Sequence, residues 1–169
     1  MADARLIIRP VRRGELAEAG RIVAASYFAL PDFPHDPTGY DLEIADVAAR
    51  LDDTEVVVAE LEGRLVGCLT YVGDPNSPFA EHQHPDAATF RYFGVDPSAQ
   101  GAGVGRSLVQ WAVERARAEA KSKLHIHTLE SMTTAQALYE RFGFVRDPAA
   151  DADWDGVKGV AYVLDLWRE

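Results

Sequence analysis

The chain of 169 residues has a single cysteine, Cys68, and comparatively few basic residues. One cysteine excludes an intrachain disulfide and is expected of a protein in a reducing cytoplasm. Cys68 lies in an apolar run, which predicts a small buried residue. Seventeen lysines and arginines against 27 acidic residues give a net charge of −10. This balance argues against general nucleic-acid binding, which takes clustered cations, and is expected either to attract a cationic partner such as an amine or simply to keep the chain soluble.

Long apolar runs are also missing. No stretch of the sequence approaches the roughly 20 residues that a membrane-spanning helix needs. Residues 1–5 do not show the charged-then-apolar pattern of a signal peptide. With 47% hydrophobic and 26% charged residues, the composition is that of a globular protein. We therefore expect one domain over residues 1–169, in the cytoplasm and away from membranes; whether it forms a homodimer stays open.

The hydrophobic periodicity predicts a mixed α/β domain. Alternating or continuous apolar runs bounded by turn residues indicate strands, and apolar residues at a spacing of three and four indicate amphipathic helices. Proline-rich loops are expected at residues 31–39 and 73–88, and an acidic loop at 147–155. The predicted strands are 6–11, 55–60, 65–72, 89–95, 124–129, 144–146 and 159–167, and the predicted helices are 15–28, 40–51, 103–120 and 133–142.

A glycine-rich loop, Gln100-Gly101-Ala102-Gly103-Val104-Gly105-Arg106, leads from a strand into the strongest predicted helix. Glycines let the main chain approach phosphate oxygens closely. The first amides of a helix lie at the positive end of its dipole, where an anion binds. The loop therefore predicts a pyrophosphate site.

Two common phosphate loops fit this segment less well. A Walker loop ends in Gly-Lys-Ser/Thr, whereas Gly105 is followed by Arg106, and Gln100 stands where its first glycine belongs. A Rossmann loop begins directly at the strand end, whereas residues 96–100 intervene here. Glu130 could serve as a ribose-binding acid, so a nicotinamide-dependent oxidoreductase stays open at this point.

A third family fits best. The pattern Gln100-x-x-Gly103-x-Gly105, after a strand and an Asp-Pro turn, resembles the acetyl-CoA loop of the GNAT superfamily of N-acetyltransferases. The segment from Ala135 to Phe144, which reads ALYERFGF from Ala137, resembles the late helix of that superfamily and the strand after it. The resemblance spans nearly the whole chain.

The resemblance implies a GNAT-like domain, with a mostly antiparallel mixed sheet that is flanked by helices and splayed between the strands at 89–95 and 124–129. It implies acetyl-CoA as co-substrate and a direct transfer of acetyl to the amine of a small molecule or peptide within a ternary complex. Tyr139 would be the general acid that protonates the departing thiolate. Main-chain groups of Phe93 and Val95 would hold the pantetheine arm. The pyrophosphate would be held by Gly101, Gly103, Val104, Gly105 and Arg106, with Gln100 at the loop entrance.

The general base is not assigned by the resemblance. Many relatives place a glutamate where this chain has Thr89, and their asparagine at the start of the late helix is replaced by Met132. The missing glutamate keeps a second function open, a non-catalytic module that binds or senses acyl-CoA. The residues that could act as base through a water chain are Glu81, His82, His84, Asp86, Glu130 and Ser131.

Two further groups of residues could bind a metal ion or the acceptor. His82-x-His84 and His125-x-His127 have the alternation of metal ligands on a strand, but no matched carboxylate or cysteine cluster accompanies them, so we expect no functional metal. The acceptor region is expected to be aromatic and acidic, which suits a cationic amine. Its candidates are Phe28, Phe33, Tyr40, Phe79, Trp154, Asp151, Asp153 and Asp155.

Overall fold

The computed structural model describes residues 5–30, 33, 39–81, 84–154 and 156–168. Pro31, Pro34, Pro37, His82 and Asp155 therefore lie outside the described residues. The described part contains eight strands and four α-helices, joined by loops and short 3-10 turns. In chain order these are β1 (Leu6–Pro10), α1 (Leu16–Phe28), α2 (Tyr40–Ala45), β2 (Glu55–Leu61), β3 (Arg64–Val72), β4 (Ala87–Val95), α3 (Val104–Ala118), β5 (Lys123–Leu129), α4 (Thr133–Arg141), β6 (Val145–Arg146), β7 (Ala152–Trp154) and β8 (Val157–Asp165).

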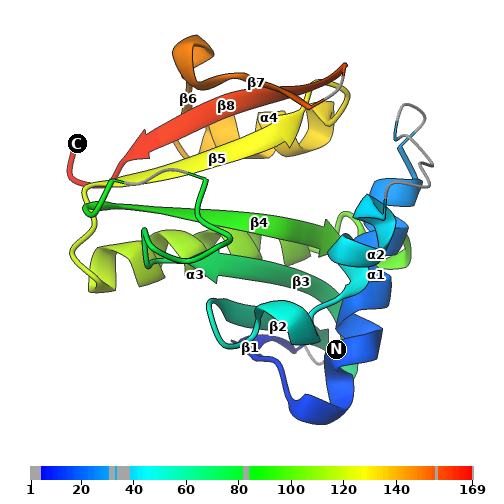
Figure 1. The fold of residues 1–169 in the computed structure, drawn as a ribbon. Helices are drawn as coiled ribbons and strands as arrows, with labels where there is room; N and C mark the ends of the chain where they lie inside the picture. The colour runs from blue at the N-terminus through cyan, green and yellow to red at the C-terminus, as the bar shows by residue number, and fades with distance from the viewer. Residues whose placement is uncertain (1–4, 31–32, 34–38, 82–83, 155, 169) are drawn as a thin grey trace.

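The strands form one mixed sheet in the order β1-β2-β3-β4-β5-β8-β6, with β7 paired to β8. All neighbouring strands are antiparallel except β4 and β5, which run parallel at the centre. Figure 1 shows the two halves of the sheet, with β5 and β8 turning away from β4. The predicted fold class, a mostly antiparallel sheet splayed in the middle, is confirmed.

The central pair of strands separates soon after it forms. β4 and β5 pair over Ala87, Ala88 and Thr89 only. Two residues later, β4 carries a bulge opposite β3, because Thr70 pairs with Arg91 but Cys68 pairs with Gly94. Tyr92 takes a left-handed conformation there, with φ 48°. A bulge bends its strand, so this extra residue directs the rest of β4 away from β5.

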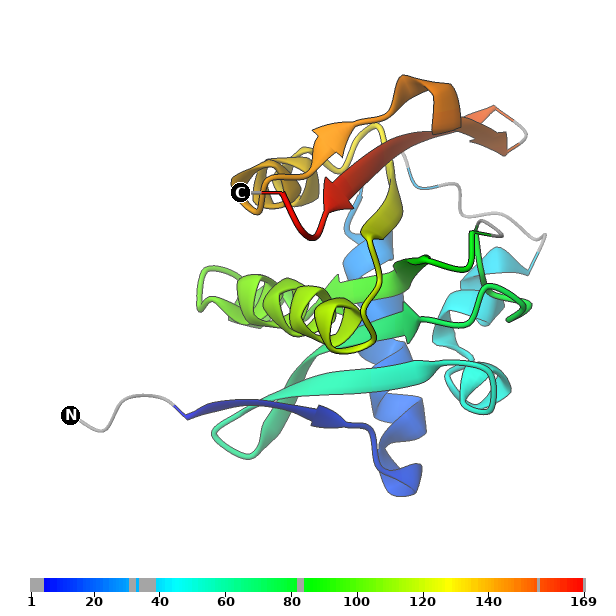
Figure 2. The same ribbon diagram turned by 90° about the vertical axis from the view of Figure 1, so that its left-hand side faces the viewer.

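Helices cover both faces of the sheet (Figure 2). α1 and α2 pack on one face, where Ile22, Val23 and Ile44 are buried against β2, β3 and Tyr92. α3 and α4 pack on the other face in a separate core that includes Leu108 and Tyr139. The splayed strands thus lie between two layers of helices.

The helix predicted for residues 40–51 is wrong in its second half. α2 ends at Ala45, and a 3-10 turn covers Ala48–Arg50. The buried Arg50 guanidinium donates hydrogen bonds to the carbonyls of Glu43, Ile44 and Asp46, at 3.0 to 3.1 Å. The Asp46 carboxylate accepts a hydrogen bond from the Ala49 amide at 3.1 Å. The Arg50 and Asp46 side chains thus bind carbonyl and amide groups that would hydrogen-bond to each other in a continuous helix.

The acidic loop predicted at 147–155 contains a strand. Ala152–Trp154 forms β7 against β8, which begins at Val157, two residues earlier than predicted. The Trp154 indole lies over Gly159, where a Cβ would approach its ring to 2.5 Å. The sequence does not predict this hairpin, because aspartates are rare in strands. The pairing depends instead on the Trp154 ring covering Gly159.

The contact between α1 and α2 yields a stability prediction. A Cβ on Gly20 would lie 2.0 Å from the carbonyl oxygen of Ala45, so α2 would have to move. We expect Gly20→Ala to destabilise the chain by about 2 kcal/mol, which lowers the melting temperature by roughly 4–8 °C. Gly14→Ala is the matched control, because a Cβ there meets nothing within 4 Å. Equal melting temperatures for the two variants would contradict the close contact.

Candidate active site

The divergence of β4 and β5 leaves main-chain groups of β4 unpaired on the side of β5. Pairing ends at Thr89 and His125. Phe93 and Val95 lie beyond that point, near the carboxyl end of β4. An unpaired strand edge offers the alternating donors and acceptors that an amide-bearing ligand can use.

The glycine-rich loop follows the end of β4. Asp96 accepts hydrogen bonds from the Ser98 amide and hydroxyl at 2.9 and 2.8 Å, which fixes the turn after the strand. Gly101 and Gly103 are left-handed, with φ 86° and 80°, and a Cβ on either would meet nothing within 4 Å. Gly103 is the N-cap of α3. A helix leaves its first amides without intrahelical partners, so those of Val104, Gly105 and Arg106 are available to a ligand at the start of α3.

Tyr139 is buried on α4, at 4% exposure, within a group of aromatic rings. Its ring centroid lies 5.9 Å from Phe90, 6.5 Å from Phe93 and 5.7 Å from Phe144. Burial raises the pKa of Tyr139 well above its ordinary value, and the negative charge of Glu81 adds to the effect. The phenol is therefore protonated at neutral pH. Among the described residues, none hydrogen-bonds its hydroxyl, so the proton is not committed to a protein acceptor.

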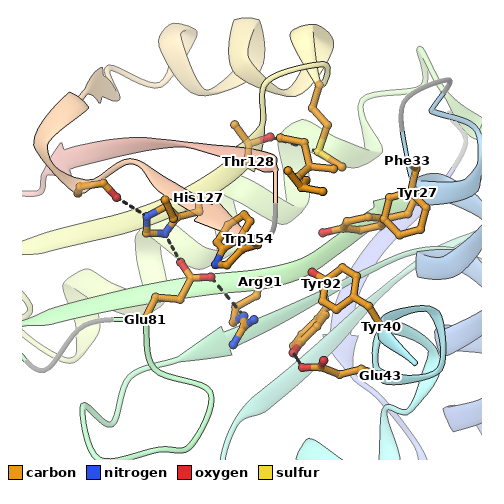
Figure 3. Close-up of a pocket in the computed structure, with 15 residues that line it drawn as sticks. Tyr27, Phe33, Tyr40, Glu43, Glu81, Arg91, Tyr92, His127, Thr128 and Trp154 are labelled. Atoms are coloured by element: carbon orange, nitrogen blue, oxygen red, sulfur yellow. Dashed lines mark hydrogen bonds and ion pairs between the residues drawn. The ribbon is translucent and has the colours of Figure 1, made fainter. Parts of the chain in front are cut away.

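A cavity of about 730 Å³ lies on the α1 and α2 side of the splayed strands (Figure 3). Both diverging strands contribute to its wall, β4 with Arg91 and Tyr92 and β5 with His127, Thr128 and Leu129. The cavity therefore borders the gap between the two strands. Its other lining residues are Tyr27, Phe33, Tyr40, Glu43, Glu81, Met132, Ala150, Ala152, Trp154 and Val157.

Three charged side chains are joined at one end of this cavity (Figure 3). Glu81 contacts the His127 Nδ1 at 2.6 Å through one oxygen and the Arg91 Nε at 3.3 Å through the other. The His127 Nε2 lies 2.8 Å from the carbonyl oxygen of Ala150. The hydrogen bond to Glu81 raises the pKa of His127 above its ordinary value. The histidine thus connects β5 to the chain segments at Glu81 and Ala150.

At the α2 end of the cavity, Tyr92 lies between two guanidinium groups. The Arg50 Cζ is 4.1 Å from the ring centroid and the Arg91 Cζ is 4.7 Å from it. The Tyr92 hydroxyl donates a hydrogen bond to the Glu43 carboxylate at 2.6 Å. The bulged residue of β4 is thereby held in place as a wall of the cavity.

The structure separates the residues that could act as general base. Of those it describes, Glu81 lines the cavity. Asp86 instead accepts a hydrogen bond from the Ser122 hydroxyl at 2.6 Å, and the His84 ring stacks on His125. Glu130 and Ser131 follow β5 but are not in the described wall.

Three of the aromatic residues expected in the acceptor region, Phe33, Tyr40 and Trp154, line the cavity. Phe28 and Phe79 contact wall residues instead, at 5.8 Å from Phe33 and 6.4 Å from Tyr92. Two of the acidic residues expected there, Asp151 and Asp153, are not among the described residues that line the cavity. Asp151 is paired with Arg146 at 2.7 Å, and Asp153 accepts a hydrogen bond from the Gly156 amide at 2.6 Å. These carboxylates hold the β7–β8 hairpin rather than facing the cavity.

No group of three or more His, Cys, Asp or Glu side chains in the described ranges could hold a metal ion. No helix in the described part of the chain is long and apolar enough to cross a membrane.

Comparison with known proteins settles the family. Residues 20–144 match the acetyltransferase (GNAT) family model. The chain belongs to the GNAT acetyltransferase family. Members of this family use acetyl-CoA as co-substrate, and the two left-handed glycines and the first amides of α3 suit its pyrophosphate.

Several curated relatives are mycothiol acetyltransferases. The one from Geodermatophilus obscurus is 30% identical over 149 residues, which cover 87% of this chain and 46% of that protein. The one from Cellulomonas flavigena is 30% identical over 150 residues, covering 82% and 40%. The chain thus spans less than half the length of these GNAT relatives.

Solved GNAT structures share the fold. An N-acetyltransferase from Staphylococcus aureus Mu50 superposes with a TM-score of 0.72 at 20% identity, covering 96% of this chain and 99% of that one. The yncA protein from Salmonella typhimurium, solved with acetyl-CoA, superposes with a TM-score of 0.71 at 22% identity, covering 97% and 95%.

Several cavity residues were not found from the sequence. The sequence pattern predicts Arg91 only as part of a strand, although a charge within an apolar strand is a weak signal of a site. The same pattern indicates His127 only as a metal ligand, and Glu43 only as part of a helix. Their roles depend on the bulge at Tyr92 and on the early end of α2, neither of which has a pattern in the sequence.

The His127 contacts predict a pH-dependent stability. Because its pKa is raised in the folded chain, the stabilisation is complete below the ordinary histidine pKa of about 6.5 and is lost as the pH rises through the raised value. The charged groups that face it are Glu81 and Asp151, and Arg91 contacts the same carboxylate. We expect wild type to have a higher melting temperature than His127→Gln, and this difference to be largest below about pH 6.5. The difference in melting temperature should shrink in alkaline buffer. In a Glu81→Gln background it should no longer depend on pH. A difference that is independent of pH with Glu81 present would contradict the account.

Proposed function

We propose that this chain transfers the acetyl group of acetyl-CoA to a primary amine of a small molecule or peptide, by direct attack within a ternary complex. The observation that carries the proposal is that both strands of the splayed pair also form the wall of the cavity. An acceptor in the cavity and a thioester between the strands would then meet at one place, which removes most of the entropic cost of bringing them together.

The residues that hold the co-substrate follow from the cleft. Main-chain groups of Phe93 and Val95 hold the pantetheine arm along the free edge of β4. The backbone amides of Gly101, Gly103, Val104, Gly105 and Arg106 hold the pyrophosphate, and Gln100 stands at the entrance of the loop. The left-handed glycines support this assignment because they keep side chains away from the phosphates.

Acetyl-CoA supplies the thioester carbonyl that the neutral amine attacks; a C–N bond replaces the C–S bond, and the proton lost from nitrogen passes through water to restore the phenol of Tyr139. Tyr139 donates its phenolic proton to the thiolate that leaves, and its burial near Phe93 keeps that proton in place until it is needed. A covalent acetyl-enzyme is not needed. No serine or cysteine lines the described cavity, and Cys68 is buried in the core. We place this reaction in the cytoplasm, within one domain over residues 1–169.

One observation favours a second candidate, a module that binds acyl-CoA without catalysis. Thr89 replaces the glutamate of many relatives, and its hydroxyl is buried without a partner among the described residues. Glu81 faces the cavity but already contacts two cationic side chains. A binding module would hold acetyl-CoA and consume none of it.

The two candidates are separated by turnover. The chain is incubated with acetyl-CoA and a panel of primary amines, release of the CoA thiol is followed, and products are identified by mass spectrometry. The proposal expects at least one amine to be acetylated, with intersecting initial-rate lines when both substrates are varied. Tight binding of acetyl-CoA without consumption across the panel would favour the module, and parallel lines would contradict direct transfer.

A further inference from the structure

The cavity holds more positive than negative charge at its Glu81 end. His127 places both ring nitrogens against acceptors, a carboxylate oxygen at 2.6 Å and a carbonyl oxygen at 2.8 Å. A neutral imidazole has one N–H donor, so satisfying both acceptors takes the imidazolium form. Arg91 is permanently charged. Glu81 therefore supplies one negative charge to two positive groups.

Arg91 keeps hydrogen-bonding capacity toward the cavity. Its Nη1 donates to the carbonyl of Phe79 at 3.1 Å, and its Nε contacts Glu81 at 3.3 Å. No described residue accepts a hydrogen bond from its Nη2. The side chain is about one-quarter exposed, in a wall of the cavity. A guanidinium fixed on one edge presents its remaining donors in a defined direction.

The second carboxylate of the cavity wall is already engaged. The Glu43 carboxylate lies at the α2 end of the cavity and accepts a hydrogen bond from the Tyr92 hydroxyl (Figure 3). Arg50, buried directly behind Tyr92, adds a third positive group. The charged side chains that line the cavity are thus Arg91, His127, Glu43 and Glu81, and Arg50 lies behind the wall. Arg91 is a cationic group of this wall that still has N–H donors without an acceptor among the described residues.

We propose that the acceptor is an amine that also carries a carboxylate, and that Arg91 binds this carboxylate. The inference rests on the proposed acetyl transfer and specifies its substrate class. The aromatic wall formed by Phe33, Tyr40 and Trp154 suits an apolar or aromatic body between the two charged groups. The N–H donors that Arg91 has left can bind the two oxygens of a carboxylate.

Matched pairs of amines test the inference. Each pair shares a body and differs by the carboxylate: phenylalanine and phenethylamine, leucine and isoamylamine, methionine and 3-(methylthio)propylamine. We expect kcat/KM to be at least tenfold higher for the amino acid of a pair, with the difference mainly in KM. Equal or reversed preference in all pairs would overturn the proposal.

Variants of Arg91 show which group produces the preference. Arg91→Gln should abolish the preference by raising KM for the amino acid at least tenfold, while the partner without the carboxylate changes less than threefold. Arg91→Lys should retain part of the preference. Arg168→Gln removes the same charge from an 87% exposed side chain and should change nothing. A full preference in a folded Arg91→Gln variant would contradict the assignment.

A binding measurement keeps this inference separate from the proposed function. N-acetylphenylalanine and N-acetylphenethylamine, the products of one pair, are titrated by calorimetry into the full chain with CoA present. We expect the carboxylate to bind at least tenfold more tightly, and the advantage to vanish in Arg91→Gln. Acetylation of amines without any carboxylate preference would overturn this inference and leave the proposed function intact. Absence of turnover with every amine would overturn the proposed function, while the titration would still decide the inference.

Discussion

Replacing Tyr139 with phenylalanine is expected to lower kcat at least a hundredfold while the affinity for acetyl-CoA and the melting temperature stay near those of wild type. General acid catalysis typically contributes 10²–10⁴ in rate, and the variant removes only the proton donor. The ring remains to fill the space between Phe90, Phe93 and Phe144. The hydroxyl makes no hydrogen bond to the described residues, so its removal leaves no protein group unsatisfied.

Tyr162→Phe is the matched control. Tyr162 belongs to the same core and its ring centroid lies 6.2 Å from that of Tyr139. Its hydroxyl donates to the Glu140 carboxylate at 3.1 Å, which is a structural contact. We expect this variant to keep its turnover within about twofold. A Tyr139→Phe variant with normal kcat would remove Tyr139 from the reaction and leave it as a core aromatic residue.

Placing a carboxylate in the glycine-rich loop is expected to weaken acetyl-CoA binding about a hundredfold. Gly103→Asp adds a negative charge at the N-cap of α3, close to where we place the pyrophosphate. The loss corresponds to about 2.7 kcal/mol, within the range for like charges at contact near a protein surface. The fold should tolerate the change, because a Cβ at Gly103 meets nothing within 4 Å, aspartate adopts left-handed conformations more readily than most residues, and aspartate is a favoured N-cap.

Gly103→Asn separates charge from shape. Asparagine has the same size and tolerates the same backbone conformation but carries no charge. Calorimetric titration should give an affinity for acetyl-CoA within about tenfold of wild type for Gly103→Asn, and melting temperatures of the two variants within a few degrees of each other. Equal losses of affinity in both variants would mean that the side chain blocks the loop sterically. Unchanged affinity in both would place the pyrophosphate elsewhere.

Local patterns were sufficient to predict most of the elements. The strand runs and the helix of residues 103–120 have clear periodicity, and the structure contains them with ends shifted by one or two residues. The helix at 40–51 failed because a buried arginine, Arg50, takes the carbonyls of Glu43, Ile44 and Asp46. That contact depends on tertiary packing, which periodicity does not record.

The proposed co-substrate side of the site has a signal in the sequence because it lies on a contiguous loop. Gly101 and Gly103 carry their function in the backbone, and a spacing of glycines before a helix is visible in sequence. The acceptor side joins Glu81, Arg91 and His127 from three separate segments. Only the splay of β4 and β5 and the bulge at Tyr92 bring them together, so no single stretch of sequence contains the signal.

Titration of acetyl-CoA into the full chain tests the central claim most directly. We predict one binding site per chain for acetyl-CoA, binding of free CoA at the same site, and no binding of NAD. The affinity for acetyl-CoA should fall about a hundredfold in Gly103→Asp. Absence of acetyl-CoA binding to the folded wild-type chain, or binding that Gly103→Asp leaves unchanged, would contradict the placement of the co-substrate in the cleft between β4 and β5.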